Sequence, residues 1–160
     1  MPYKVHDWVI HPAHGAGQIT NIESIVVAGE KLETYVILYP NLKHMTLRVP
    51  TQSNLLRKPV SQRDVPKLIK VLRQPKRKGR RMWSQRKRDL EAKMSTGNAY
   101  DIAAVARDTY RADSTESSYS ESEIQRKVVD MLAREIAASK GEEFDQALRL
   151  VLDTLAKAHS

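Results

Sequence analysis

The chain has 160 residues, of which 41% are hydrophobic, so it can fold around the core of one ordinary domain or of two small ones. It contains no cysteine, which excludes disulfides, thiolate chemistry and cysteine-ligated metal sites. No segment approaches the roughly 20 apolar residues that cross a bilayer, and no signal peptide opens the chain, so we expect a cytosolic protein without a membrane partner.

The net charge of +8 is concentrated in the middle of the chain. Residues 60–113 hold 15 basic and 6 acidic side chains, whereas residues 114–160 hold 6 and 9. A localised basic block is typical of proteins that bind a polyanion. Nucleic acid is the first candidate, because the block lacks the apolar face of a membrane-surface helix.

The first 60 residues have the pattern of a small, strongly bent β-sheet or barrel. Short β-branched runs separated by Pro and Gly come first, and Gly15 and Gly17 fit a tight turn. The segment Leu32–Pro40 is rich in Val, Ile and Tyr and predicts a strand. A hairpin turn at Ala28–Lys31 is expected to lead into it.

The segment His44–Pro50 alternates in polarity along its length. Its apolar positions are Met45, Leu47 and Val49. A period of two predicts a half-buried strand with Thr46 and Arg48 facing outward. Unless the sheet closes into a barrel, an edge strand of this kind needs a partner.

From Ser61 onward the apolar residues recur at helical spacing. The predicted helical segments are 61–74, 84–97, 98–113, 124–141 and 142–158. Pro75 ends the first of them, Asn98 is a predicted N-cap, and Gly141 is a predicted C-terminal stop. The pattern Ser120–Glu123 predicts a capping box.

Amphipathic helices joined by short connections predict a compact helical bundle. Strands followed by helices predict an α+β fold class, here as two domains that cover residues 1–60 and 61–160.

The sequence shows no catalytic constellation, so we expect neither an enzyme nor a cofactor. Four histidines lie in the β region without an accompanying carboxylate motif, namely His6, His11, His14 and His44, and we predict no metal site. The stretch HGAGQI lacks the Lys-Ser/Thr ending of a phosphate-binding loop.

The segment Lys76–Arg88, KRKGRRMWSQRKR, places Trp83 within the densest positive charge of the chain. One interpretation is that Trp83 belongs to the core, since it shares a rough helical face with Leu90 and Met94. The other is that the cations neutralise phosphates while the indole enters a base step or stacks on an unpaired base. At the edge of melted DNA, such a contact would favour the melted state.

Three segments, in this order and spacing, resemble the CarD/CdnL family of bacterial transcription regulators. They are YKVHDWVIHPAHGAGQI at 3–19, MTLRVP at 45–50 and MWSQRKRDLEAKMSTGNAYDIAAVARD at 82–108. The resemblance covers nearly the whole chain. It implies a Tudor-like N-terminal domain that docks on the β subunit of RNA polymerase. It also implies a helical domain that contacts promoter DNA at the upstream edge of the transcription bubble and stabilises the open complex.

The resemblance also implies roles for single residues. The wedge tryptophan of the family falls on Trp83, and its polymerase-contacting arginine falls on Arg48. Two positions depart from the family pattern: Gln85 stands where a basic residue is frequent, and Ile25 where some members carry an arginine that aids docking.

We therefore expect a monomer that binds the RNA polymerase β subunit and promoter DNA. Phosphate contacts are predicted for Arg80, Arg81, Arg86, Lys87 and Arg88. Polymerase contacts are predicted for Arg48 and for neighbouring Thr46. Two other classes stay open: a nucleoid or DNA-binding protein that acts without polymerase, and an RNA- or ribosome-associated protein.

Overall fold

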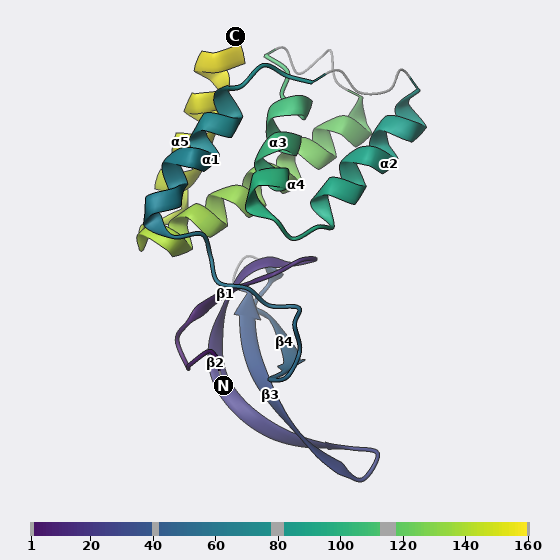
Figure 1. Ribbon diagram of the computed structural model, residues 1–160, viewed down its shortest axis with the longest axis vertical. Helices are drawn as coiled ribbons and strands as arrows, with labels where there is room; N and C mark the ends of the chain where they lie inside the picture. The colour runs from purple at the N-terminus through teal and green to yellow at the C-terminus, as the bar shows by residue number, and fades with distance from the viewer. Residues whose placement is uncertain (1, 40–41, 78–81, 113–117, 160) are drawn as a thin grey trace. The chain divides into compact units, whose positions relative to one another are not determined.

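The computed structural model divides the chain into two compact units, Met1–Pro59 and Val60–Ser160. The described residues are 2–39, 42–77, 82–112 and 118–159. The first unit is a curled antiparallel sheet and the second is helical (Figure 1). The predicted α+β fold class is confirmed, while the likeness of the first unit to a Tudor domain stays a prediction.

The sheet of the first unit has the strand order β1-β2-β3-β4, with each neighbouring pair antiparallel. The strands are β1 (Trp8–His11), β2 (Gly15–Val27), β3 (Glu30–Tyr39) and β4 (Met45–Pro50). The long strands β2 and β3 curve together over their whole length (Figure 1). Their register shifts between Ile19 and Asn21, and a bulge of this kind increases the bend and twist of a strand.

The turn between β2 and β3 lies where the sequence predicted it. Val27 pairs with Glu30, which leaves Ala28 and Gly29 as a two-residue loop. Both loop residues have positive φ, 51° and 80°. This conformation matches the right-handed twist of the flanking strands, and it is the reason a glycine is favoured in such a turn.

The predicted alternation of β4 is confirmed. Val49 is buried and Met45 and Leu47 are partly buried, whereas Thr46 and Arg48 are exposed. Most buried apolar residues of this unit form one cluster: Val9, Ile19, Tyr35, Ile37, Tyr39, Val49 and Leu56. Burial raises the pKa of Tyr39 to about 12. The outward-facing residues of β4, Thr46 and Arg48, therefore take no part in core packing.

Gly17 lies inside β2, opposite Val9, and not in the tight turn that the sequence suggested. A Cβ at this position would lie 2.5 Å from Cγ2 of Ile37 and 2.7 Å from Cε1 of Tyr39. Both neighbours are fully buried and cannot move into solvent. Glycine is therefore required here by close packing and not by backbone conformation.

Gly17→Ala should destabilise the protein by about 1–3 kcal/mol, the usual cost of forcing extra atoms into a packed core. Chemical denaturation gives this free energy of unfolding directly. Gly29→Asn is the matched control, because a Cβ at Gly29 meets nothing within 4 Å and asparagine tolerates positive φ. Equal stability of Gly17→Ala and wild type would contradict the close packing.

His11 is the last residue of β1, and its side chain lies beside the turn that leads into β2. Its Nδ1 accepts a hydrogen bond from the backbone N–H of Ala13 at 3.0 Å, and its ring lies 4.9 Å from that of His14. Burial, and secondarily the neighbouring His14, lower the pKa of His11. Within the part of the chain that the structure describes, no three His, Cys, Asp or Glu residues gather as metal ligands.

The lowered pKa of His11 makes stability depend on pH. The unfolded chain binds a proton at His11 at a higher pH than the folded protein does, so acidification below about pH 6.5 favours unfolding. We expect the free energy of unfolding to decrease between pH 7.5 and pH 5, and His11→Gln to reduce this decrease. Denaturation curves of wild type and His11→Gln at the two pH values measure the decrease in the free energy of unfolding. An unchanged pH dependence in the variant would contradict the assignment.

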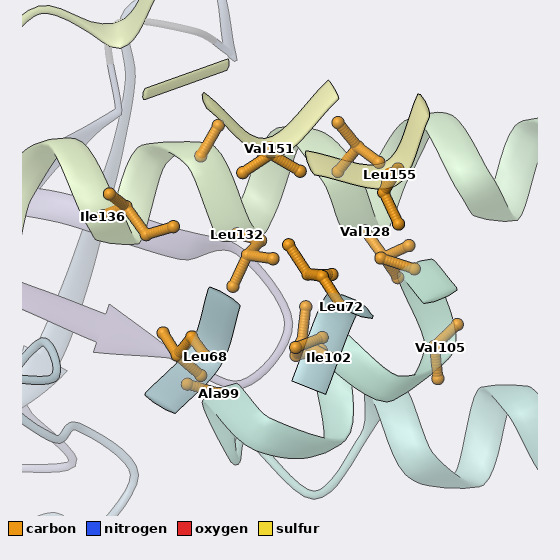
Figure 2. Packing of buried hydrophobic residues seen from close by; sticks show 14 of the residues in the cluster. Leu68, Leu72, Ala99, Ile102, Val105, Val128, Leu132, Ile136, Val151 and Leu155 are labelled. Atoms are coloured by element: carbon orange, nitrogen blue, oxygen red, sulfur yellow. The ribbon is translucent and has the colours of Figure 1, made fainter. Parts of the chain in front are cut away.

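The second unit consists of helices around one apolar core. They are η2 (Gln62–Asp64, a 3-10 helix), α1 (Val65–Arg73), α2 (Trp83–Met94), α3 (Ala99–Thr109), α4 (Tyr119–Lys140) and α5 (Phe144–His159). Figure 2 shows side chains of α1, α3, α4 and α5 meeting in this core, among them Leu68, Leu72, Ile102, Leu132 and Leu155. None of the described helices is long and apolar enough to span a membrane.

Most helix boundaries follow from local signals. The side chain of Asn98 caps α3 by accepting a hydrogen bond from the backbone N–H of Tyr100, and Gly141 ends α4 with a φ of 65°. The predicted capping box at Ser120 is displaced by two residues. The N-cap of α4 is Ser118, whose hydroxyl accepts a hydrogen bond from the backbone N–H of Glu121 at 3.1 Å.

Candidate nucleic-acid interface and docking strand

Trp83 is the first residue of α2 and is neither fully buried nor fully exposed. Part of the indole packs against the core of the helical unit. The two interpretations drawn from the sequence are therefore compatible, because one part of the ring is held by the bundle and another part remains accessible. A partly accessible ring with a fixed base is what a stacking or wedging contact needs.

The helix that carries Trp83 has little apolar surface of its own. In α2, every residue of which the structure describes, Leu90 alone is fully buried. Trp83, Arg86 and Leu90 follow one another at intervals of three and four and so share one face of the helix. That face packs mainly along α3. An arginine therefore occupies the middle of the stripe that faces the bundle.

Arg86 is held by hydrogen bonds inside the protein. Its guanidinium donates to the two carboxylate oxygens of Glu121 at 3.1 and 3.4 Å and to the backbone carbonyl of Asp108 at 3.1 Å. The side chains of Arg86 and Glu121 are only 16% and 7% exposed. The guanidinium carbon also lies 5.6 Å from the ring centroid of Trp83, within cation–π distance. The predicted phosphate contact of Arg86 stays a prediction, although its guanidinium already has these partners.

A second set of contacts holds the chain where the basic segment Lys76–Arg88 begins. Asp108 accepts hydrogen bonds from the guanidinium of Arg107 at 2.7 Å and from the backbone N–H of Arg77 at 3.0 Å. Arg107 in turn donates to the side-chain carbonyl of Gln74 at 3.0 Å. The C-terminal end of α3 thus contacts the chain on both sides of residues 78–81. We call this set of side chains, Gln74, Arg86, Arg107, Asp108 and Glu121, the polar anchor.

The other predicted phosphate-binding cations lie in different settings. Lys87 and Arg88 are exposed on α2, and the Nζ atom of Lys87 lies 4.0 Å from a carboxylate oxygen of Glu91. Ion pairs this long and exposed contribute little, so phosphate can replace Glu91 at small cost. Arg80 and Arg81 lie outside the described residues.

The polar anchor contains residues that sequence reasoning missed. No role was assigned from the sequence to Arg107, Asp108 or Glu121, yet all three are buried. One signal was available for Arg86, since its spacing from Trp83 and Leu90 places it on the inward face. For the contact of Asp108 with the backbone of Arg77 and for that of Glu121 with Arg86 no local signal exists, because the two partners lie far apart in the sequence.

The predicted docking residues lie on the outer face of the first unit. Arg48 donates from its guanidinium to the carboxylate of Glu23 at 2.9 Å, and the two side chains are 45% and 41% exposed. Thr46 is exposed two residues earlier in β4. Among the described residues β4 pairs only with β3, so it forms one edge of the sheet. An exposed edge with an accessible arginine suits docking to another chain.

The sequence matches two protein-family models, one over each part of the chain. The model "CarD-like/TRCF RID domain" matches residues 3–60 and the model "CarD, C-terminal domain" matches residues 67–152. The chain is also 30% identical over 145 residues to "Putative transcription factor YdeB" of Bacillus subtilis (strain 168), an alignment that covers 87% of this chain and 93% of the relative. The expected family is thus confirmed: the chain belongs to the CarD/CdnL family and has the role of a transcription regulator.

Proposed function

We propose that this protein binds the β subunit of RNA polymerase through its first unit and promoter DNA through its second, and thereby stabilises the open complex. Trp83 is the wedge at the upstream edge of the bubble. The observation that carries the proposal is the placement of Trp83: a half-buried indole at the start of α2, followed by the exposed cations Lys87 and Arg88. In this proposal the protein acts as a monomer.

The placement of Trp83 suits a wedge for an energetic reason. Inserting an apolar side chain at an intact base step costs roughly a few kcal/mol of lost stacking. At the edge of a bubble the step is already partly unstacked, so the indole gains contact without the full cost. The protein then binds the melted DNA more tightly than the closed duplex, and this difference in affinity is what shifts the equilibrium.

The docking role of Arg48 is supported by the exposure of its ion pair. Exposed pairs of this kind contribute only about 0–1 kcal/mol, so Arg48 can leave Glu23 for a carboxylate on polymerase at small cost. The edge of β4 offers backbone hydrogen bonds to a strand of the partner. Polymerase would then determine where on the promoter the protein binds, because the exposed cations of α2 contact phosphates and do not recognise bases.

The lifetime of open complexes tests the bridge. With the cognate polymerase, wild type should lengthen the lifetime. Trp83→Ala should reverse most of that effect, because base–aromatic stacking contributes about 1–3 kcal/mol, or roughly 5- to 150-fold. Arg48→Glu should act similarly by preventing docking, whereas Lys58→Glu, with the same charge change at an exposed position of the first unit, should not. The lifetime is read from the decay of heparin-resistant complexes.

The outcomes separate the alternatives. If wild-type protein does not change the open-complex lifetime, the proposal that it stabilises the open complex is contradicted. If Arg48→Glu lengthens the open-complex lifetime as much as wild type does, Arg48 has no docking role. That result would favour a DNA-binding protein that acts independently of polymerase.

The salt dependence of binding to duplex DNA tests the phosphate contacts. Each phosphate contact adds about 0.9 to the slope of log K against log salt concentration, so Lys87→Gln and Arg88→Gln should each lower the slope by about that amount. Lys157→Gln, which removes an exposed lysine at the end of α5, is the control and should leave the slope unchanged. Fluorescence anisotropy of a labelled duplex at several salt concentrations measures this. Equal slopes in all variants would exclude Lys87 and Arg88 from the interface.

A further inference from the structure

We infer that Glu121 is a positioning residue for the DNA contact: by binding Arg86 it holds the end of α2 that carries Trp83 in the geometry that a wedge requires. This inference rests on the proposed function. Glu121 has no direct role in binding DNA, and its negative charge opposes the approach of phosphate.

The first step of the argument is the weak apolar packing of α2. A helix with one fully buried residue, Leu90, gains little from the hydrophobic effect and needs other contacts to fix its orientation. Leu90 lies two turns from Trp83, so it fixes the middle of the helix and not its first turn. Near the first turn, the partial packing of Trp83 is joined by the hydrogen bonds of Arg86 with Glu121 and with the carbonyl of Asp108.

The second step is the geometry of the ion pair. Arg86 uses a forked contact to both oxygens of Glu121, a bond type that restrains direction as well as distance. Arg111 also contacts Glu121, at 3.0 Å, so the carboxylate is held between two cations. Because Glu121 is only 7% exposed, water competes poorly for these bonds. The guanidinium beside the Trp83 ring is therefore fixed, and it restricts the positions open to the indole.

The third step is the position of Glu121 at the start of α4, where its backbone and its side chain make different contacts. Its backbone N–H donates to the N-cap Ser118, as in a capping box. Its carboxylate lies in the first turn of α4, where the helix dipole favours negative charge, and binds Arg86 across the bundle. The start of α4 is thus linked to the start of α2 through one side chain.

Electrostatics and positioning make opposite predictions for Glu121→Gln. Removing a negative charge near the interface should strengthen binding to DNA if charge alone matters. If Glu121 positions Trp83, the same change should shorten the open-complex lifetime about threefold or more, since a hydrogen bond to a charged group is weakened. Affinity for duplex DNA should be unchanged or higher.

Glu123→Gln is the matched control. It removes the same charge from the same helical turn, but Glu123 is 43% exposed and pairs with a neighbour on its own helix, Arg126, at 2.9 Å. We expect it to leave the lifetime unchanged or longer. A second readout needs no polymerase: with Trp8→Phe as background, Trp83 is the sole tryptophan. Acrylamide quenching of its fluorescence should increase with Glu121→Gln and not with Glu123→Gln.

The outcomes are distinct. If wild type lengthens the lifetime and Glu121→Gln behaves like Glu123→Gln in both lifetime and quenching, the positioning role is overturned while the proposed function stands. If wild type has no effect on the lifetime, the proposed function fails, and quenching alone still decides whether Glu121 fixes Trp83. Should Glu121→Gln fail to fold by circular dichroism, Arg86→Lys decides, because it keeps the charge but loses the forked contact. A normal lifetime and normal quenching in Arg86→Lys overturn the inference.

Discussion

The helix that carries Trp83, α2, is tied to the rest of the helical unit by a buried ion pair between Arg86 and Glu121. Buried charges are costly unless every partner is in place, and removing one partner destabilises more than the intact pair stabilises. The pair therefore enforces one arrangement of α2 against α3 and α4 instead of adding much to the free energy of folding. The position of Trp83, on the first turn of α2, is set by this arrangement. The backbone of Arg77 is held separately, by its hydrogen bond to Asp108.

Each unit contains an arginine–glutamate ion pair, and the two pairs lie in opposite settings. Arg48 and Glu23 form an exposed pair that water and salt screen and that a partner can replace. Arg86 and Glu121 form a pair whose side chains are mostly shielded from solvent. An arginine near a functional surface can thus be a recognition group or a positioning group, and its burial and its partners distinguish the two roles.

The sequence predicted what depends on neighbouring residues and missed what depends on distant ones. The outward direction of β4 and the cap at Asn98 follow from local patterns, and both were right. The start of α4 was displaced because two overlapping Ser-x-x-Glu patterns compete, and the first one caps the helix. The predicted phosphate contact of Arg86 stays a prediction, but its helical phase already placed this side chain on the inward face of α2. The role of Glu121 required the tertiary fold, since no sequence pattern links it to α2.

The central claim, that the indole of Trp83 contacts a base at the upstream edge of the bubble, can be measured with 2-aminopurine. The probe would replace single bases across that edge in open complexes formed with the cognate polymerase and wild-type or Trp83→Ala protein. Stacking on the indole predicts a fluorescence difference between the two proteins at one or two adjacent positions and none further along the duplex. Identical fluorescence at every position, with both proteins bound, would contradict the account.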